Sequence, residues 1–335
     1  MLATGTLVLL PPTAASAVPA TFHYTWPVAR GAFHVHSNRS DGTGTLDEIA
    51  AAARATGLHF VVVTDHGNGT REPEPPAYRS GVLCIDGVEI STQHGHYIAL
   101  GVGRAPYPLA GHPKDVIDDV RRLGGFGIAA HPGSPKDALR WGDWDAPFDG
   151  LEWLNADSEW RDEFWGSLGG VLLTYAFRPV ETLAGLLDRP ETVLRQWDRV
   201  TRLRRVSAIA GADAHARLGF ARGGDPYDDR IMAEVPAYEV SFRAFANHVL
   251  LERALNGNAA RDASLVLSAI REGRTFTSID GLAGLSAFEA KATSGAAVAP
   301  IGEYLDPEGP VVLDARIGAP PGTTLIVRRD GEVLY

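Results

Sequence analysis

The feature that most constrains this chain is a strand, helix and strand unit between residues 31 and 66. Residues 31–35 form a short apolar run, and a capping box at Thr45 to Glu48 begins an Ala-rich helix that ends near Gly57. Residues 58–63 are apolar and β-branched, which is typical of a parallel strand buried on both faces. The order predicts a βαβ unit, whose chemistry is expected at the carboxyl ends of its strands.

Histidine and aspartate side chains stand where both strands end. His34 and His36 alternate with Phe33 and Val35, so we expect the two histidines to share one face of the strand while the apolar pair packs behind. An Asp-His pair at 65–66 follows the second strand. Core or surface histidines are the alternative, but so many candidate ligands within one unit favour a metal site.

The composition limits the class of protein. The chain has 335 residues, 45% hydrophobic and 21% charged, enough for one large domain plus something smaller. A net charge of -10, with no Lys/Arg block, argues against a nucleic-acid partner. Cys84 is the only cysteine, so the sequence has no intrachain disulfide and no thiolate metal cluster. No apolar run approaches the length of about 20 residues that spans a membrane.

Residues 1–20 resemble the end of a signal peptide. An apolar core at 6–10 precedes two candidate cleavage sites, at 15–17 and 18–20. The basic segment is missing, because no charged residue precedes Arg30, and a disordered Ala/Pro-rich leader is the alternative. We expect an exported protein, periplasmic or extracellular.

Later strands also end on candidate ligands. Residues 87–91 deliver Glu89, residues 126–130 stop at His131 before a proline, and residues 206–210 run into Asp213 and His215. Helices are predicted between these strands and at 113–123, 242–255 and 263–272. Strands that alternate with helices over this length predict an α/β fold with a mainly parallel sheet.

Together these motifs resemble the polymerase and histidinol phosphatase family, called PHP. The matching residues are His34-x-His36, Asp41, Thr64-Asp65-His66, Glu89, His96, His131-Pro132 and Asp213-x-His215. The resemblance implies a distorted (β/α)7 TIM-like barrel over residues 21–285, with two or three divalent metal ions at the strand ends. Short β-like runs in 286–335 predict a small C-terminal β-sandwich-like appendage, which stops straight after an Asp-Gly turn as an incomplete domain would. Exported family members with such an appendage are similar to the carbaryl-hydrolase branch.

The resemblance also implies how the ligands are shared. The first ion would take His34, His36, Glu89 and Asp213, the second Glu89, His96 and His131, and the third Asp41, His66 and His215. Many family members have histidine where this chain has Asp41, so the third set departs most from the pattern. Spacing does not decide between His94 and His96, but the family pattern favours His96.

The donor set itself suits a hard or borderline metal. Six histidines and three carboxylates without sulfur fit zinc, manganese or iron. Such ions hold a water between them and lower its pKa enough to supply hydroxide. Asp65 is expected either to orient a ligand or to cap a helix. Arg39 is a candidate for binding a substrate anion, against the alternative of a solvated loop arginine.

Three functions fit these residues. The first, a metal-dependent phosphoesterase acting on a small-molecule ester, is the commonest activity that the resemblance implies. The second is a carboxylic or carbamate ester hydrolase, favoured by the few Lys and Arg residues near the motifs. The third is a non-catalytic metal-containing binding module, which the nearly complete ligand set disfavours. The residues leave the oligomeric state and the substrate open.

Overall fold

The computed structural model describes residues 7–8, 26–162, 168–216, 236–283, 287–318 and 322–334. The predicted leader lies outside these residues except for β1 (Leu7–Val8), which pairs in parallel with β15 (Val311–Gly318). The predicted domain boundary after residue 285 also falls in an undescribed stretch. Export and the exact boundary therefore stay predictions. No described helix has the length and apolar character needed to cross a membrane.

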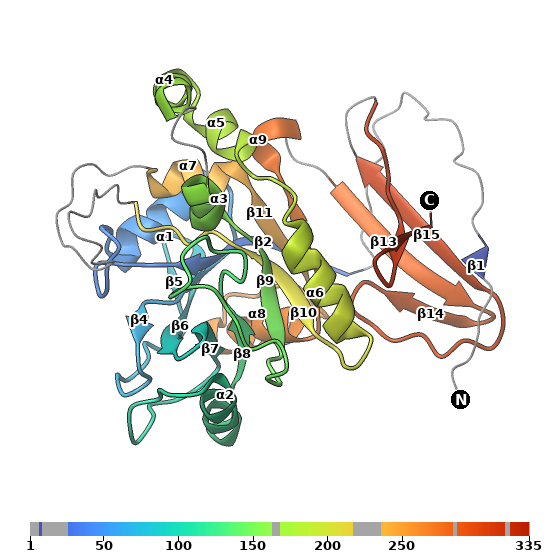
Figure 1. Cartoon of the computed structure of the whole chain (residues 1–335), viewed down its shortest axis with the longest axis horizontal. Helices are drawn as coiled ribbons and strands as arrows, with labels where there is room; N and C mark the ends of the chain where they lie inside the picture. The colour runs from blue at the N-terminus through green and yellow to red at the C-terminus, as the bar shows by residue number, and fades with distance from the viewer. Residues whose placement is uncertain are drawn as a thin grey trace.

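A long sheet curls into a nearly closed barrel (Figure 1). Its strands, in spatial order, are β10 (Ser207–Gly211), β9 (Gly150–Asn155), β8 (Phe126–Ala129), β7 (Gly95–Leu100), β6 (Val82–Thr92), β3 (Phe60–Val63), β2 (Val28–Val35), β11 (Ala246–Leu250) and β12 (Thr275–Ser278). Two short strands, β4 (His66–Gly67) and β5 (Ala77–Arg79), add to β6. The segment after β10 returns to β2, where the Ala212 amide donates to the Phe33 carbonyl at 2.8 Å. The predicted distorted TIM-like barrel is confirmed.

The sheet is mixed, so the prediction of a mainly parallel sheet is wrong. β2, β3 and β6 run parallel, as do β8, β9 and β10, but β7 is antiparallel to both its neighbours. β11 is antiparallel to β2 and β12, and it occupies part of the helix predicted at 242–255. All five residues of β11 are buried, and Phe242, Ala246, Val249 and Leu250 recur at the spacing of a helix, so pairing with β2 and β12 overrides the local pattern.

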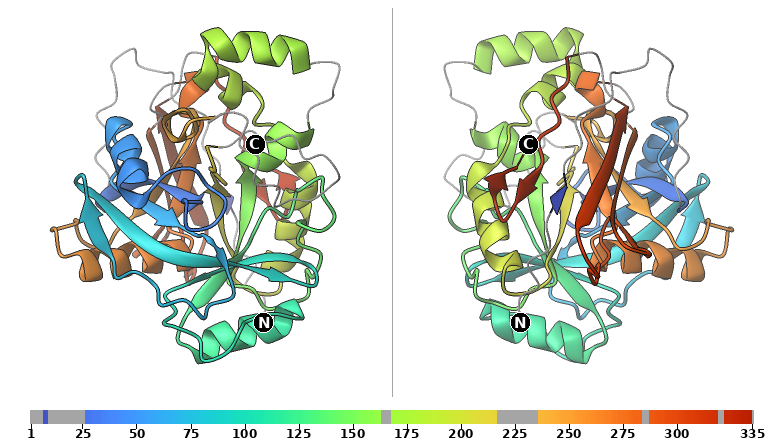
Figure 2. Two further views of the ribbon diagram at one scale, coloured as in Figure 1. Left: turned by 90° about the vertical axis from the view of Figure 1, so that its left-hand side faces the viewer. Right: turned by 90° about the vertical axis from the view of Figure 1, so that its right-hand side faces the viewer.

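In the described residues, helices lie around the barrel (Figure 1). They are α1 (Leu46–Ala55), α2 (Pro113–Arg122), α3 (Ala156–Asp162), α4 (Leu168–Phe177), α5 (Pro179–Gly185), α6 (Glu191–Thr201), α7 (Tyr238–Ala244), α8 (Ala259–Arg271) and α9 (Asp280–Ala283). The predicted capping box of α1 is confirmed, with Thr45 and Glu48 bonding each other's backbone amides. Both views of Figure 2 place α2 at the opposite end of the molecule from α4 and α5.

A bulge at His34 changes how β2 presents its side chains. The register with β3 shifts between Phe33 and Val35, and His34 has a φ of 63°. Phe33 packs in one core cluster with Val62, whereas Val35 packs in another with Val61. The prediction that Phe33 and Val35 pack together behind the histidines is therefore wrong.

One side chain helps to close the barrel where β10 and β11 meet. The buried Asn247 amide accepts from the Ala210 N–H at 3.1 Å and donates to the Ala210 carbonyl at 2.7 Å. These are the bonds that a neighbouring strand's peptide group would make. Asn247 Oδ1 also accepts from the Thr277 hydroxyl of β12 at 3.0 Å. Asn247 thus ties together three strands at the barrel seam.

The C-terminal appendage is a four-stranded sheet beside the barrel (Figures 1 and 2). β13 (Ala287–Ser294) lies between β14 (Ala297–Pro300) and β15, and β1 forms the other edge. β16 (Arg328–Arg329) and β17 (Glu332–Val333) form a separate hairpin. The buried Arg274 guanidinium, next to β12, bonds Glu303 of the appendage at 3.2 Å. The appendage is therefore tied to the barrel by an ion pair between a buried arginine and a partly exposed glutamate.

Candidate metal centre

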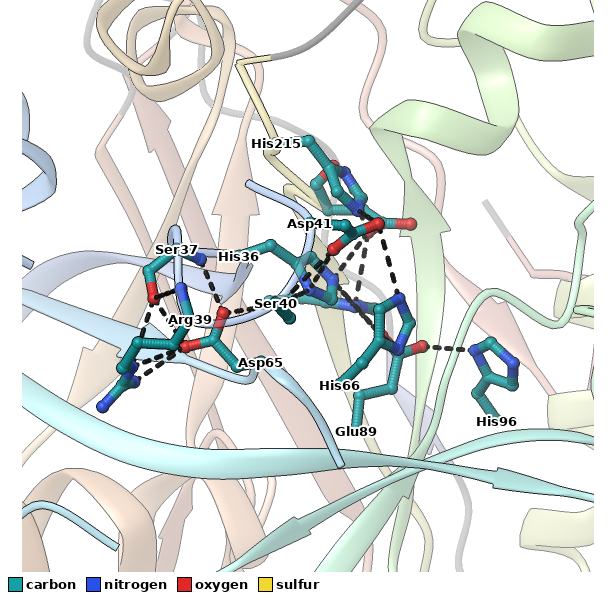
Figure 3. Close-up of polar contacts among 12 residues, drawn as sticks. His36, Ser37, Arg39, Ser40, Asp41, Asp65, His66, Glu89, His96 and His215 are labelled. Carbon is teal, nitrogen blue, oxygen red and sulfur yellow. Dashed lines mark hydrogen bonds and ion pairs between the residues drawn. The ribbon is translucent and has the colours of Figure 1, made fainter. Parts of the chain in front are cut away.

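The side chains predicted from the sequence as metal ligands converge at one end of the barrel, and Figure 3 labels six of them. His34 and His36 come from the end of β2, His66 begins β4, and His131 follows β8. Glu89 lies in β6 and His96 in β7. Asp213 and His215 follow β10, and Asp41 lies in the loop before α1. The rings of His36 and His215 stack, with centroids 4.1 Å apart, because the segment after β10 returns to β2, where the His36 N–H donates to the Ala214 carbonyl at 3.0 Å.

The Glu89 carboxylate lies at the centre of this cluster. Its Oε1 is 2.8 Å from both His96 Nδ1 and His131 Nε2. Its Oε2 is 3.1 Å from His34 Nε2 and 3.2 Å from both His36 Nε2 and His66 Nδ1. Each carboxylate oxygen thus has its own set of imidazoles, which is the arrangement expected of a carboxylate shared between two ions.

The cluster divides into a buried part and a more accessible part. The inner group comprises His34, His36, Glu89, His96, His131 and Asp213, each of which is at most 8% exposed. The outer group comprises Asp41, His66 and His215, whose side chains are 17–22% exposed. In the outer group, Asp41 Oδ2 lies 3.2 Å from His215 Nε2 and 3.7 Å from His66 Nε2. The outer group is therefore the part that a substrate would meet first.

The donor atoms are close enough together for shared coordination. Four overlapping sets have donor atoms all within 4.8 Å of one another: His36, Asp41, His66 and His215; His34, His36 and Glu89; His34, His131 and Asp213; and His66, Glu89 and His96. His34 Nε2 and His36 Nε2 point at each other at 3.1 Å. The donors are imidazole nitrogens and carboxylate oxygens that face one another, and none of them is sulfur. Such a donor set fits Zn²⁺, Mn²⁺ or Fe²⁺.

Three residues of the inner group adopt a left-handed backbone. His34, His131 and Asp213 have φ values of 63°, 30° and 46°. Residues other than glycine rarely adopt this region, and such strain gathers at functional sites. The unusual backbone lets a residue at a strand end turn its side chain into the barrel mouth.

Sequence reasoning missed two buried partners of the cluster, both on β9. Glu152 Oε1 lies 2.6 Å from His34 Nδ1, and Oε2 accepts from the His131 N–H at 2.7 Å. The Asn155 amide donates to Glu152 at 2.9 Å and to Asp213 at 3.3 Å. A carboxylate in the middle of an apolar strand was the available signal, because a buried charge requires a partner.

Ionisation in the cluster is governed by mutual pairing. Burial opposes the charge on Glu89, yet His34, His66 and His131 hold the pKa of its carboxyl well below the usual range. Burial likewise opposes a charged His36, but hydrogen bonds to Asp213 and Glu89 raise its pKa to about 10. For His66 burial dominates and lowers the pKa to about 4. The site therefore keeps its carboxylates charged, and a divalent cation would enter it by displacing imidazole protons.

The two candidates for other roles, Asp65 and Arg39, lie beside the cluster rather than in it. Asp65 caps no helix, since β4 follows it, and its oxygens accept from Ser37, Arg39 and Ser40. The Arg39 guanidinium bonds Asp65 at 2.8 Å, Asp86 at 2.6 Å and Glu74 at 3.2 Å, and it points away from the ligands (Figure 3). These contacts disfavour the prediction that Arg39 binds a substrate anion, because three carboxylates already surround its guanidinium.

The structure separates His94 from His96. His96 is buried against Glu89, whereas His94 is exposed and its ring lies 6.1 Å from that of His112. Of the two, only His96 reaches the cluster.

Comparison with known proteins gives partial matches. No model of a known protein family matches the sequence. A 3',5'-nucleoside bisphosphate phosphatase from Chromobacterium violaceum is 34% identical over 121 residues, which are 33% of this chain and 42% of that protein. An uncharacterized protein from Methanocaldococcus jannaschii is 33% identical over 111 residues, 32% of this chain and 64% of the relative. The matches thus span less than two thirds of either relative.

A solved structure is similar over more of the chain. It is a two-domain protein from Bacteroides vulgatus, described as containing a predicted PHP-like metal-dependent phosphoesterase. The likeness covers 89% of this chain and 88% of that one, with 16% identity and a TM-score of 0.43. A likeness this distant says nothing about the reaction.

Proposed function

We propose that this chain carries a PHP domain and is a metal-dependent phosphoesterase that hydrolyses a small-molecule phosphate ester. The observation that carries the proposal is the convergence of five imidazoles on the shared Glu89 carboxylate at the barrel mouth, with Asp41, Asp213 and His215 in overlapping donor sets beside it. The Chromobacterium violaceum relative, named as a phosphatase, supports the choice of a phosphate ester.

We assign the inner group to two ions and the outer group to a third. His34, His36, Glu89 and Asp213 would hold the first ion, and Glu89 with His96 and His131 the second. Asp41, His66 and His215 would hold the third. When bound, such ions supply a water of lowered pKa as nucleophile and positive charge for the phosphoryl oxygens. The choice among zinc, manganese and iron is left to metal analysis.

The residues of the chain itself give this site its order. Glu152 fixes the orientation of the His34 ring through Nδ1, which leaves Nε2 to face Glu89. Glu152 also holds the His131 backbone, so one carboxylate orients ligands from two strands. The exposure of the outer group leaves that side of the cluster open to a substrate.

Metal analysis and a three-substrate assay test the proposal. The purified chain is expected to contain two or three divalent ions and to hydrolyse p-nitrophenyl phosphate or its phosphodiester, with activity lost on chelation and regained on metal return. An aryl carbamate serves as the matched substrate for the competing ester hydrolase. Hydrolysis of the carbamate alone would replace the phosphoesterase by that activity, and metal without turnover of any substrate would favour a binding module.

A further inference from the structure

The loop from Ser37 to Ser40 connects the inner and outer groups. It begins at His36, in the inner group, and ends at Asp41, in the outer group. Asp41 Oδ1 lies 3.4 Å from His36 Nδ1, while Oδ2 faces His215. The conformation of this loop therefore sets where the Asp41 carboxylate stands relative to the outer histidines.

A single buried carboxylate holds that loop. Asp65, 2% exposed, accepts from the Ser37 N–H at 2.7 Å and the Ser40 hydroxyl at 2.6 Å through Oδ1. Its Oδ2 accepts from the Ser37 hydroxyl at 2.7 Å and from Arg39 Nε at 2.9 Å. Every residue between His36 and Asp41 except Asn38 thus bonds this carboxylate (Figure 3).

Arg39 fixes Asp65 and its loop to the rest of the barrel. Its guanidinium bonds Asp86 of β6, whose carboxylate also accepts from the Glu74 N–H at 2.9 Å. Asp65 is in addition directly followed by His66, a second outer residue, and its carbonyl accepts from the Glu89 N–H at 3.2 Å. The Asp65 side chain thus holds the loop that ends at Asp41, whereas its backbone joins His66 and also Glu89 of the inner group.

We propose that Asp65, braced by Arg39, is a positioning residue that sets the metal affinity of the outer group while leaving that of the inner group unchanged. The inference rests on the proposed function, because it assigns an ion to each group. The inner ligands His34, His131 and Asp213 are oriented by Glu152 and Asn155 on the opposite side. Loss of the Asp65 carboxylate would therefore let the positions of Asp41 and His66 vary, while the orientation of His34, His131 and Asp213 is kept.

Zinc titration of Asp65→Asn tests this assignment. The asparagine amide has nearly the same volume as the carboxylate. However, its NH₂ group would face N–H or O–H groups of Ser37, Arg39 or Ser40 that donate hydrogen bonds to Asp65. With bound Zn²⁺ measured at stepped free concentrations, wild type should fill a tight and a weaker class of sites. We expect Asp65→Asn to weaken only the second class, by about 10- to 100-fold. High Zn²⁺ should then restore turnover, since the ligands themselves remain.

Two further variants make the test specific. Ser40→Ala removes one bond to Asp65 and should shift the weaker class in the same direction by less. Asp262→Asn is the matched control, because Asp262 is a buried carboxylate that accepts from the Asn256 and Gly257 amides and, in the described part of the chain, forms no hydrogen bond or ion pair with the cluster. It should leave both classes unchanged.

The outcomes separate this inference from the proposed function. Equal weakening of both classes, an unchanged isotherm in Asp65→Asn, or the same shift in Asp262→Asn would overturn the positioning role. A single class of sites in an active wild type would overturn it too, while the phosphoesterase stands. A wild-type chain that binds no zinc, manganese or iron would remove the proposed function itself.

Discussion

Replacing Glu152 by glutamine separates the support of the metal centre from its ligands. Glu152 is 1% exposed and accepts three hydrogen bonds, at 2.6, 2.7 and 2.9 Å. Glutamine preserves the volume but has one acceptor oxygen instead of two. Whichever way the amide turns, its NH₂ group faces either His34 Nδ1 or the His131 N–H.

The size of the effect follows from these bonds. A hydrogen bond to a charged group contributes about 1.5–3 kcal/mol, and a buried donor left without a partner costs about 1–3 kcal/mol. We therefore expect Glu152→Gln to lower the free energy of unfolding by about 2–4 kcal/mol. Loss of the partner that orients a ligating histidine should also weaken metal binding by about 10- to 100-fold, or about 1.4–2.7 kcal/mol.

Two measurements on the same variant give the answer. Urea unfolding of the metal-free chain reports the stability change, and competition with a chelator reports the affinity of the tight class of sites. Asp262→Asn again serves as the control for loss of a buried carboxylate outside the site. Lower stability with unchanged metal affinity would refute the orienting role of Glu152 and leave it a structural residue.

Three other perturbations test the site and the barrel. Glu89→Gln should lower metal content and reduce turnover by more than the roughly 100-fold loss expected for an outer-shell partner; a fully active, fully loaded variant would remove Glu89 from the site. Burial, Arg30 and His59 lower the pKa of His248 to about 4, below its usual value of about 6.5, so the stability present above pH 6.5 is lost as the pH falls toward 4. At pH 5 the loss is about 2 kcal/mol, and His248→Gln should flatten this part of the stability curve measured in urea; superimposable curves would contradict the assignment. Asn247→Leu should cost about 2–5 kcal/mol in urea unfolding because both polar groups of Ala210 lose their partner, against about 1 kcal/mol for Thr277→Val, and equal costs would argue against closure of the seam by Asn247.

Local sequence signals predicted the opening unit well. The capping box at Thr45 and the apolar run at 58–63 gave the correct helix and strand. The same rules failed at residues 246–250, where the apolar residues recur at helical spacing although the segment is a buried antiparallel strand. Whether such a run is helix or strand is decided by its neighbours β2 and β12, which are remote in sequence.

The candidate ligands were predictable, whereas their support was not. Histidines and carboxylates at strand ends are visible in the sequence, and the barrel brings them together. The bulge at His34 could not be predicted, because the enrichment of histidine at positive φ does not single out one of the eleven histidines of the chain. The partners of Arg39 were also hidden, since Asp86 and Glu74 reach it only through the packing of β6.

The left-handed backbone at His34, His131 and Asp213 has a consequence for the whole barrel. Conformations of this kind cost on the order of 1–3 kcal/mol at each residue. Glycine would relieve the strain at all three positions, but it would also delete the side chains that we assign to metal. On this assignment the strained ligands lower the free energy of unfolding of the metal-free chain, and metal binding compensates for that loss. The metal-loaded protein should accordingly have a higher melting temperature than the metal-free chain.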